Sequence, residues 1–151
     1  MKSPRDISLV VLRVALGWIF LYAGYTKVID PTWSAEGYLK GAKTFSGFYG
    51  WLASADMLAI TNFLNEWGLT LLGVALILGI FVRFSALAAA AMMLLYYFPV
   101  LEFPLVDHSY IVDEHIVYAV AFVVLAVFQA GRAWGLDSML KSRISQFSRF
   151  T

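Results

Sequence analysis

The chain has 151 residues, of which 61% are hydrophobic and 14% are charged, with a formal net charge of +1 and no cysteine. Soluble domains have about 25% charged and about 45–50% apolar residues, so this composition indicates a membrane protein. The small net charge argues against a nucleic-acid partner, and the absence of cysteine excludes disulfides, iron–sulfur clusters and thiol redox relays within the chain.

Four hydrophobic segments follow one another along the chain. They cover about residues 7–28, 63–81, 84–101 and 114–130. Each is near the length of about 17–25 residues at which a helix crosses a bilayer, and none alternates as a barrel strand does. The first segment is too long for the apolar region of a signal peptide, so we expect a retained anchor. The sequence therefore predicts an all-α, integral membrane four-helix bundle that forms a single domain over residues 1–151.

The basic residues predict the orientation of this bundle. Most Lys and Arg side chains precede the first segment, separate the second from the third, or follow the fourth: Lys2, Arg5, Arg83, Arg132, Lys141, Arg143 and Arg149. By the positive-inside rule both termini are cytoplasmic, and residues 29–62 and 102–113 form outer loops. The long loop 29–62 carries many aromatic residues and few charges, so we expect one or two short interfacial helices in it.

Small residues predict how the first helix packs. Gly17 and Gly24 lie seven residues apart and share a helix face, which is typical of close contact between membrane helices. Arg13 and Lys27 lie on the same stripe. Arg13 has two open interpretations: its long side chain snorkels to the cytoplasmic headgroups, or it finds a partner inside the bundle.

Titratable residues gather at the outer ends of the four segments. The candidates for catalysis are His115, Glu114, Glu66 and Lys27. An equally ordinary interpretation exists for the group around His115, since Asp113 is a favourable N-cap and Glu114 complements the helix dipole. His108 and His115 suit zinc or iron as ligand types, but their spacing matches no tight motif, so we expect no metal site. Haem is also not expected, because both histidines lie in the same outer loop and helix start rather than on facing helices of the bundle.

Four strings carry a family resemblance: LRVALGWIFLYAGYTKVIDPTW (12–33), WGLTLLGVALILGIFVRFSALAAAAMM (67–93), VDEHIVYA (112–119) and AGRAWGLD (130–137). Together they resemble the DoxX family of four-helix membrane proteins, and most closely its DoxD-like members, the membrane subunit of thiosulfate:quinone oxidoreductase. The resemblance implies a plasma-membrane protein that passes electrons from thiosulfate to quinone, giving tetrathionate. It also implies a second small subunit, of which this chain has no counterpart.

These observations favour a quinone-linked redox subunit, with quinone as the cofactor. Histidine and carboxylates pass protons near neutral pH, and Lys27 would attract an anionic sulfur donor. The residues expected to contact the quinone are Arg13, Tyr118, Trp33 and Trp67.

Two other functions stay open. In the first, the chain is a non-catalytic accessory subunit of a larger respiratory or monooxygenase complex, in contact with lipid and with other membrane subunits or copies of itself. In the second, which we rank last, it conducts protons or small solutes. A quinone subunit should have a pocket near His115 and Glu66, whereas an accessory subunit should have satisfied pairs among the outer charges.

Overall fold

The computed structural model describes residues 3–106 and 109–136, and these residues are mostly helical. The helices are α1 (Pro4–Val28), α2 (Glu36–Lys40), α3 (Ser46–Leu52), α4 (Leu58–Leu78), α5 (Val82–Val100) and α6 (Glu114–Val127), followed by the short 3₁₀ helix η1 (Ala130–Arg132). A small antiparallel sheet of order β1-β2-β3 is formed by β1 (Leu101–Glu102), β2 (Leu105–Val106) and β3 (Ser109–Tyr110). This sheet was not expected from the sequence, because two-residue strands have no detectable alternation.

Three of the four expected spans are present at full length. Helices α1, α4 and α5 are long and apolar enough to cross a membrane. The segment expected at residues 114–130 is wrong at its end, because α6 has only 14 residues. At 1.5 Å per residue it is about 21 Å long, which is shorter than the about 30 Å of a hydrocarbon core. Helix α6 ends there because Gln129 adopts a left-handed conformation with φ 50°.

The other helix boundaries differ from the expected ones by a few residues. Helix α1 begins at Pro4 because Ser3 caps it and Pro is favoured in the first turn. Helix α4 begins at Leu58, which shortens the long loop, and α2 and α3 are the two short helices expected in that loop. The basic residues expected after residue 136, and the acid and histidine at 107 and 108, lie outside the described residues.

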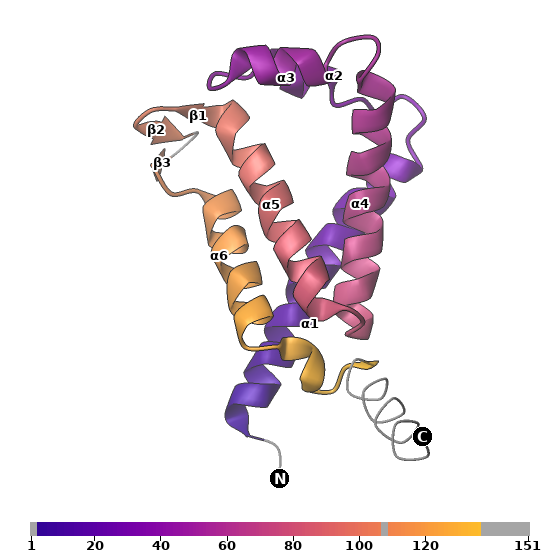
Figure 1. The fold of residues 1–151 in the computed structure, drawn as a ribbon, viewed down its shortest axis with the longest axis vertical. Helices are drawn as coiled ribbons and strands as arrows, with labels where there is room; N and C mark the ends of the chain where they lie inside the picture. Colours follow the sequence, from indigo (N-terminus) through magenta and orange to yellow (C-terminus); the bar gives the residue numbers. More distant parts are fainter. Residues whose placement is uncertain (1–2, 107–108, 137–151) are drawn as a thin grey trace, which may run out of the picture.

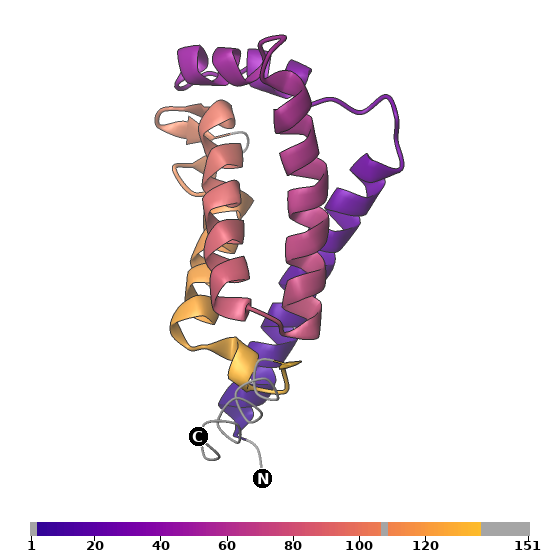
Figure 2. The same cartoon turned by 45° about the vertical axis from the view of Figure 1, so that its right-hand side comes forward.

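The helices associate as two pairs, α1 with α4 and α5 with α6 (Figure 1). Seen from the side in Figure 2, α2 and α3 extend across the ends of α4 and α5. At the opposite end, η1 contacts α1 and α5. We call residues 33–53, which include α2 and α3, the roof.

Glycines determine the close contact between α1 and α4. A Cβ atom added to Gly24 would meet the backbone of Thr70, and one added to Gly73 would meet the backbone of Leu21. The packing role expected for Gly17 and Gly24 is therefore confirmed, since a Cβ on Gly17 would also lie 2.9 Å from the Ile77 side chain. The buried ring of Phe20 in α1 contacts that of Phe122 in α6, with 4.8 Å between the ring centroids, and joins the two helix pairs.

Candidate functional site: a roofed cavity between α4 and α5

A cavity of about 300 Å³ lies under the roof, between the ends of α4 and α5. Its lining combines aromatic rings, aliphatic side chains and a few polar groups. The residues that line it are Lys27, Trp33, Ser34, Ala35, Tyr38, Leu39, Tyr49, Leu52, Thr61, Asn65, Met92, Leu95 and Tyr96. Cavities of this size, mainly apolar with a small number of placed polar groups, are typical of small-molecule sites.

Lys27 supplies the positive charge of this cavity. It lies in the last turn of α1, where its Nζ atom donates to the Ala23 carbonyl over 3.2 Å. The same atom lies 5.2 Å from the centroid of the Trp33 ring, within the range of a cation–π interaction. The described residues offer Lys27 no carboxylate within ion-pair distance, Glu66 included. An ammonium with one backbone acceptor has two further N–H donors to offer a ligand.

Tyr96 and Asn65 form the polar pair that crosses the cavity from α5 to α4. The Tyr96 hydroxyl donates to Asn65 Oδ1 over 2.5 Å. The Tyr96 ring also contacts the ring of Tyr38 in the roof at 6.1 Å and that of His115 in α6 at 6.0 Å. Tyr96 is therefore the residue through which the cavity, the roof and α6 meet.

The roof is attached to the end of α5 by hydrogen bonds to backbone carbonyls. Tyr38 Oη donates to the Tyr96 carbonyl, and Tyr49 Oη donates to the Leu95 carbonyl over 3.0 Å. Further along, the Lys43 amide donates to Pro99 over 2.9 Å and Thr44 Oγ1 to Leu101 over 2.6 Å. The Pro99 carbonyl lies in the last turn of α5, where carbonyls have no helical partner, and the Leu95 carbonyl lacks one because residue 99 is a proline.

His115 forms a pair with Asp113 at the start of α6. The distance from His115 Nδ1 to Asp113 Oδ2 is 2.6 Å, and Asp113 Oδ1 accepts from the Ile116 amide over 3.1 Å. The second of these bonds confirms that Asp113 is the N-cap of α6. His115 lies behind Tyr96 and does not line the cavity.

The remaining candidates lie beside the cavity or away from it. Glu66 and Trp67 follow Asn65 in α4 but do not line the cavity, and the exposed Trp67 ring contacts that of Phe63 at 6.5 Å. Glu114 is exposed, and Tyr118 packs against the hydrophobic core. Of the eight residues singled out from the sequence, Lys27 and Trp33 are the ones that line the cavity.

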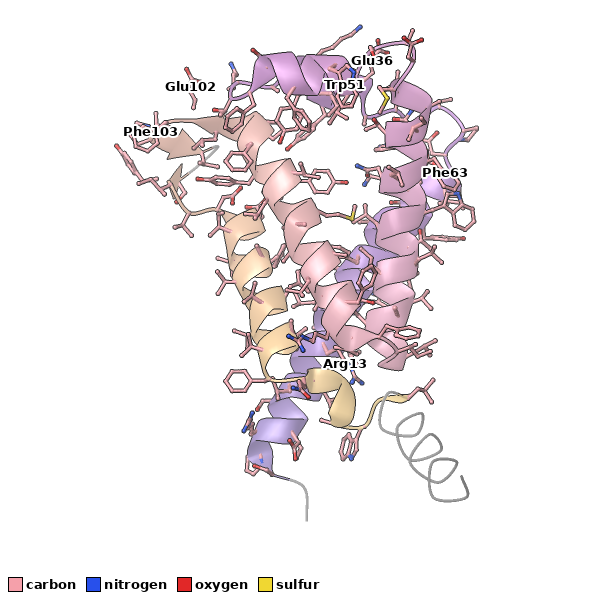
Figure 3. The ribbon with its side chains drawn as sticks, viewed as in Figure 1. Arg13, Glu36, Trp51, Phe63, Glu102 and Phe103 are labelled. Carbon is pink, nitrogen blue, oxygen red and sulfur yellow. The ribbon has the colours of Figure 1, made fainter. Side chains whose placement is uncertain are left out.

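Arg13 lies at the opposite end of the molecule, where α6 passes into η1 (Figure 3). It is 2% exposed, and its guanidinium donates to the carbonyls of Ala130 (2.9 Å), Ala133 (3.2 Å) and Trp134 (3.4 Å). A Cβ atom added to Gly79 or Gly135 would come within 3 Å of its Nη1 atom. The interpretation with a partner inside the fold is thus confirmed, and the partners among the described residues include these three main-chain carbonyls.

Comparison with protein families identifies the chain. The model of the DoxX family matches residues 8–101, more than half of its length. This protein belongs to the DoxX family. No curated protein and no solved structure matches it significantly.

The DoxX match includes the whole cavity, because every lining residue lies between Lys27 and Tyr96. It ends before Glu114, His115 and Tyr118. The cavity of this DoxX protein is therefore formed by residues within the family match. Helix α6 lies outside the match and contacts Tyr96 through the ring of His115.

Sequence reasoning missed most residues of the cavity. Asn65 is an uncharged residue beside the charged Glu66, and Tyr96 is one of two adjacent tyrosines in an apolar helix. A polar amide inside a predicted span is costly unless it is paired, and this was the available signal for Asn65. No comparable signal distinguishes Tyr96 from Tyr97.

Proposed function

We propose that this DoxX family protein is a quinone-linked redox subunit of the plasma membrane, DoxD-like, which binds the quinone ring in the roofed cavity. The observation that carries the proposal is the cavity itself, with Lys27 and Trp33 on one side and Tyr96 on another. It combines flat aromatic walls with a cation in a largely apolar site. A planar ring with electronegative oxygens fits such a lining, whereas a cationic ligand does not.

In the membrane, α1, α4, α5 and α6 form a four-helix bundle with both termini in the cytoplasm and the roof at the outer surface. The distribution of Lys and Arg supports this orientation. The aromatic residues of the roof support its location at the interface, where amphipathic rings accumulate. Exposed members of this group are Phe45, Phe48 and Trp51. At this depth a lipid-soluble quinone reaches the cavity from the bilayer and an anionic donor reaches it from outside.

The reaction we propose balances with thiosulfate as the electron donor. Two thiosulfate ions lose one electron each and join through a new S–S bond as tetrathionate, while one quinone takes up the two electrons and two protons to become quinol. Lys27 attracts the anion and polarises a quinone carbonyl. Among the described residues, we assign the proton transfer to His115, which is paired with Asp113 behind Tyr96, with Glu66 and Glu114 as further proton carriers.

An accessory role is the second candidate, and the pair of His115 with Asp113 favours it. Both groups already have partners within α6, as expected for a cap that stabilises a helix start rather than for a catalytic dyad. In this case the electrons and the redox centre belong to other subunits, and the cavity holds a lipid or quinone as a structural ligand.

The test is quinone binding and reduction by the purified protein in lipid nanodiscs. Binding of a short-tailed quinone is measured by quenching of tryptophan fluorescence, with Trp33→Phe to identify the signal. We expect Lys27→Met to weaken binding about tenfold or more, because a charge-assisted hydrogen bond is lost. Lys43→Met is the matched control, since Lys43 is exposed and does not line the cavity.

Turnover then separates the two candidates. Quinol formation from thiosulfate is followed for the purified chain and for native membranes, in wild type and His115→Ala. Activity of the isolated chain that falls in His115→Ala supports a catalytic subunit. An inert chain that binds quinone and co-purifies with a larger complex supports the accessory role, and absence of quinone binding refutes the cavity assignment.

A further inference from the structure

Two asparagines one turn apart on α4 are used differently. Asn62 is occupied at both ends, because its Oδ1 accepts from the Ala35 amide over 3.0 Å and its Nδ2 donates to Ser34 Oγ over 3.4 Å. Asn65 accepts the Tyr96 hydroxyl at Oδ1, but the described residues provide no acceptor for its Nδ2. Asn62 therefore holds the roof, whereas Asn65 has N–H donors left for something inside the cavity that it lines.

Tyr96 determines which end of the Asn65 amide is free. The Tyr96 hydroxyl has one proton, and among the described residues Asn65 Oδ1 is its acceptor. If the amide were reversed, Nδ2 would face the hydroxyl and the hydroxyl proton would lose that acceptor, which is unfavourable in this part-buried position. The hydrogen bond thus keeps Oδ1 toward Tyr96 and leaves Nδ2 available.

The side-chain N–H donors of the lining with capacity for a ligand include those of Asn65 and Lys27. Asn65 Nδ2 has two N–H groups, and Lys27 Nζ has two beyond the one that it gives to Ala23. The tyrosine hydroxyls of the lining are already donated to Asn65 or to main-chain carbonyls. A ligand that presents two strong acceptor oxygens therefore matches these two groups of donors.

We propose that Asn65, positioned by Tyr96, donates to one carbonyl of the bound ring while Lys27 faces the other, so that the cavity distinguishes the dione from the diol. This inference rests on the proposed function and adds a redox-state preference to it. A quinone offers two carbonyl acceptors to the two donors. A quinol presents hydroxyl oxygens, which are weaker acceptors than carbonyls for the same two donors, so it binds more weakly and leaves after reduction.

The test compares three probes of nearly equal shape: a methylnaphthoquinone, its quinol kept under anaerobic conditions, and methylnaphthalene, which has neither oxygen. Affinities are measured by tryptophan quenching in nanodiscs. For wild type we expect the quinone to bind about tenfold or more tightly than either of the others, from two hydrogen bonds of ordinary strength.

Three variants then test which side chains cause the preference for quinone over quinol. Asn65→Leu removes the donors, and Asn65→Asp replaces a donor by an acceptor while keeping the size. We expect both to reduce the quinone-to-quinol affinity ratio about fivefold to tenfold, and Tyr96→Phe to reduce it less, because the released amide can still rotate into place. Lys43→Met is the control outside the lining and should leave the ratio unchanged.

The outcomes separate the inference from the proposed function. If wild type binds quinone tightly but Asn65→Asp keeps the wild-type ratio in a folded protein, the role of Asn65 is wrong and the cavity assignment stands. If wild type binds quinone and methylnaphthalene equally, the cavity recognises the ring alone and the inference fails. If wild type binds no quinone, both fail. A merely structural role of Asn65 would weaken all three probes together.

Discussion

Tyr49 in the roof completes a hydrogen bond that Pro99 removes from α5. In an α-helix the Leu95 carbonyl accepts from the amide four residues later, but residue 99 is a proline and has no N–H group. The Tyr49 hydroxyl donates to that carbonyl over 3.0 Å, and Tyr49 is 2% exposed. The roof is therefore held at a point where the helix itself cannot satisfy its backbone.

Tyr49→Phe should loosen the roof. The ring stays, but the Leu95 carbonyl loses its hydrogen bond, which costs about 0.5–1.5 kcal/mol for a part-buried bond. We expect a lower melting temperature and faster amide exchange in residues 35–53. Tyr22→Phe is the control, because Tyr22 is 64% exposed. Unchanged exchange in the roof would show that this bond does not hold it.

Pro99→Ala should separate helix stability from attachment of the roof. The new amide can donate to Leu95 within α5, so the helix gains a backbone hydrogen bond while Tyr49 loses its acceptor. We expect equal or higher global stability together with faster exchange in the roof. A variant in which both quantities fall would indicate that the shape of Pro99, rather than its missing N–H, is what matters.

The roof should also respond to high pH. Burial raises the pKa of Tyr49 above its ordinary value of 10.0. Because the folded-state pKa is the higher one, the contribution to stability is complete below about pH 10 and is lost as the pH rises through the folded pKa. The ultraviolet absorbance of tyrosinate, compared between wild type and Tyr49→Phe, measures this titration. A titration of Tyr49 at or below pH 10 would contradict the burial seen here.

Gly24→Ala should be strongly destabilising although it adds one methyl group. The added Cβ would meet the Thr70 backbone, and backbone cannot move as a flexible side chain can. Overpacking of this kind costs about 1–3 kcal/mol. Gly37→Ala is the matched control, since a Cβ there meets nothing within 4 Å. Thermal unfolding in detergent compares them, and similar melting temperatures would refute close packing of α1 on α4.

Arg13→Met should destabilise the end of the molecule around η1 without affecting ligand binding. Three carbonyl acceptors lose their donor, for a cost of about 2–4 kcal/mol after partial hydration. Arg13→Lys should recover part of this, because a single ammonium reaches fewer acceptors. Quinone affinity measured at Trp33 should stay within about twofold of wild type. A selective loss of affinity with normal stability would return Arg13 to the group of quinone-binding residues.

Composition and residue spacing were enough to predict the membrane character, the long apolar helices and their small-residue faces. These properties are local, because composition indicates that the chain lies in lipid and the spacing of glycines along one helix indicates which face packs against a neighbour. The N-cap at Asp113 was predictable for the same reason, because a cap depends on the next three residues. The length of α6 was not predictable. The helix ends just before Gln129, a residue in the left-handed conformation, although the sequence on either side of it is apolar.

The location of the cavity depends on how the helices pack and could not be predicted from local patterns. Charge directed attention to His115 and Glu66, because ionisable groups are conspicuous in an apolar sequence. The cavity instead depends on where the roof crosses α4 and α5, and it joins Lys27 to Asn65 and Tyr96 across long stretches of chain. The pairing of Arg13 with carbonyls near residue 130 is of the same kind. A helix face can be derived from periodicity, but the contact of one helix with a distant loop depends on how all the helices pack.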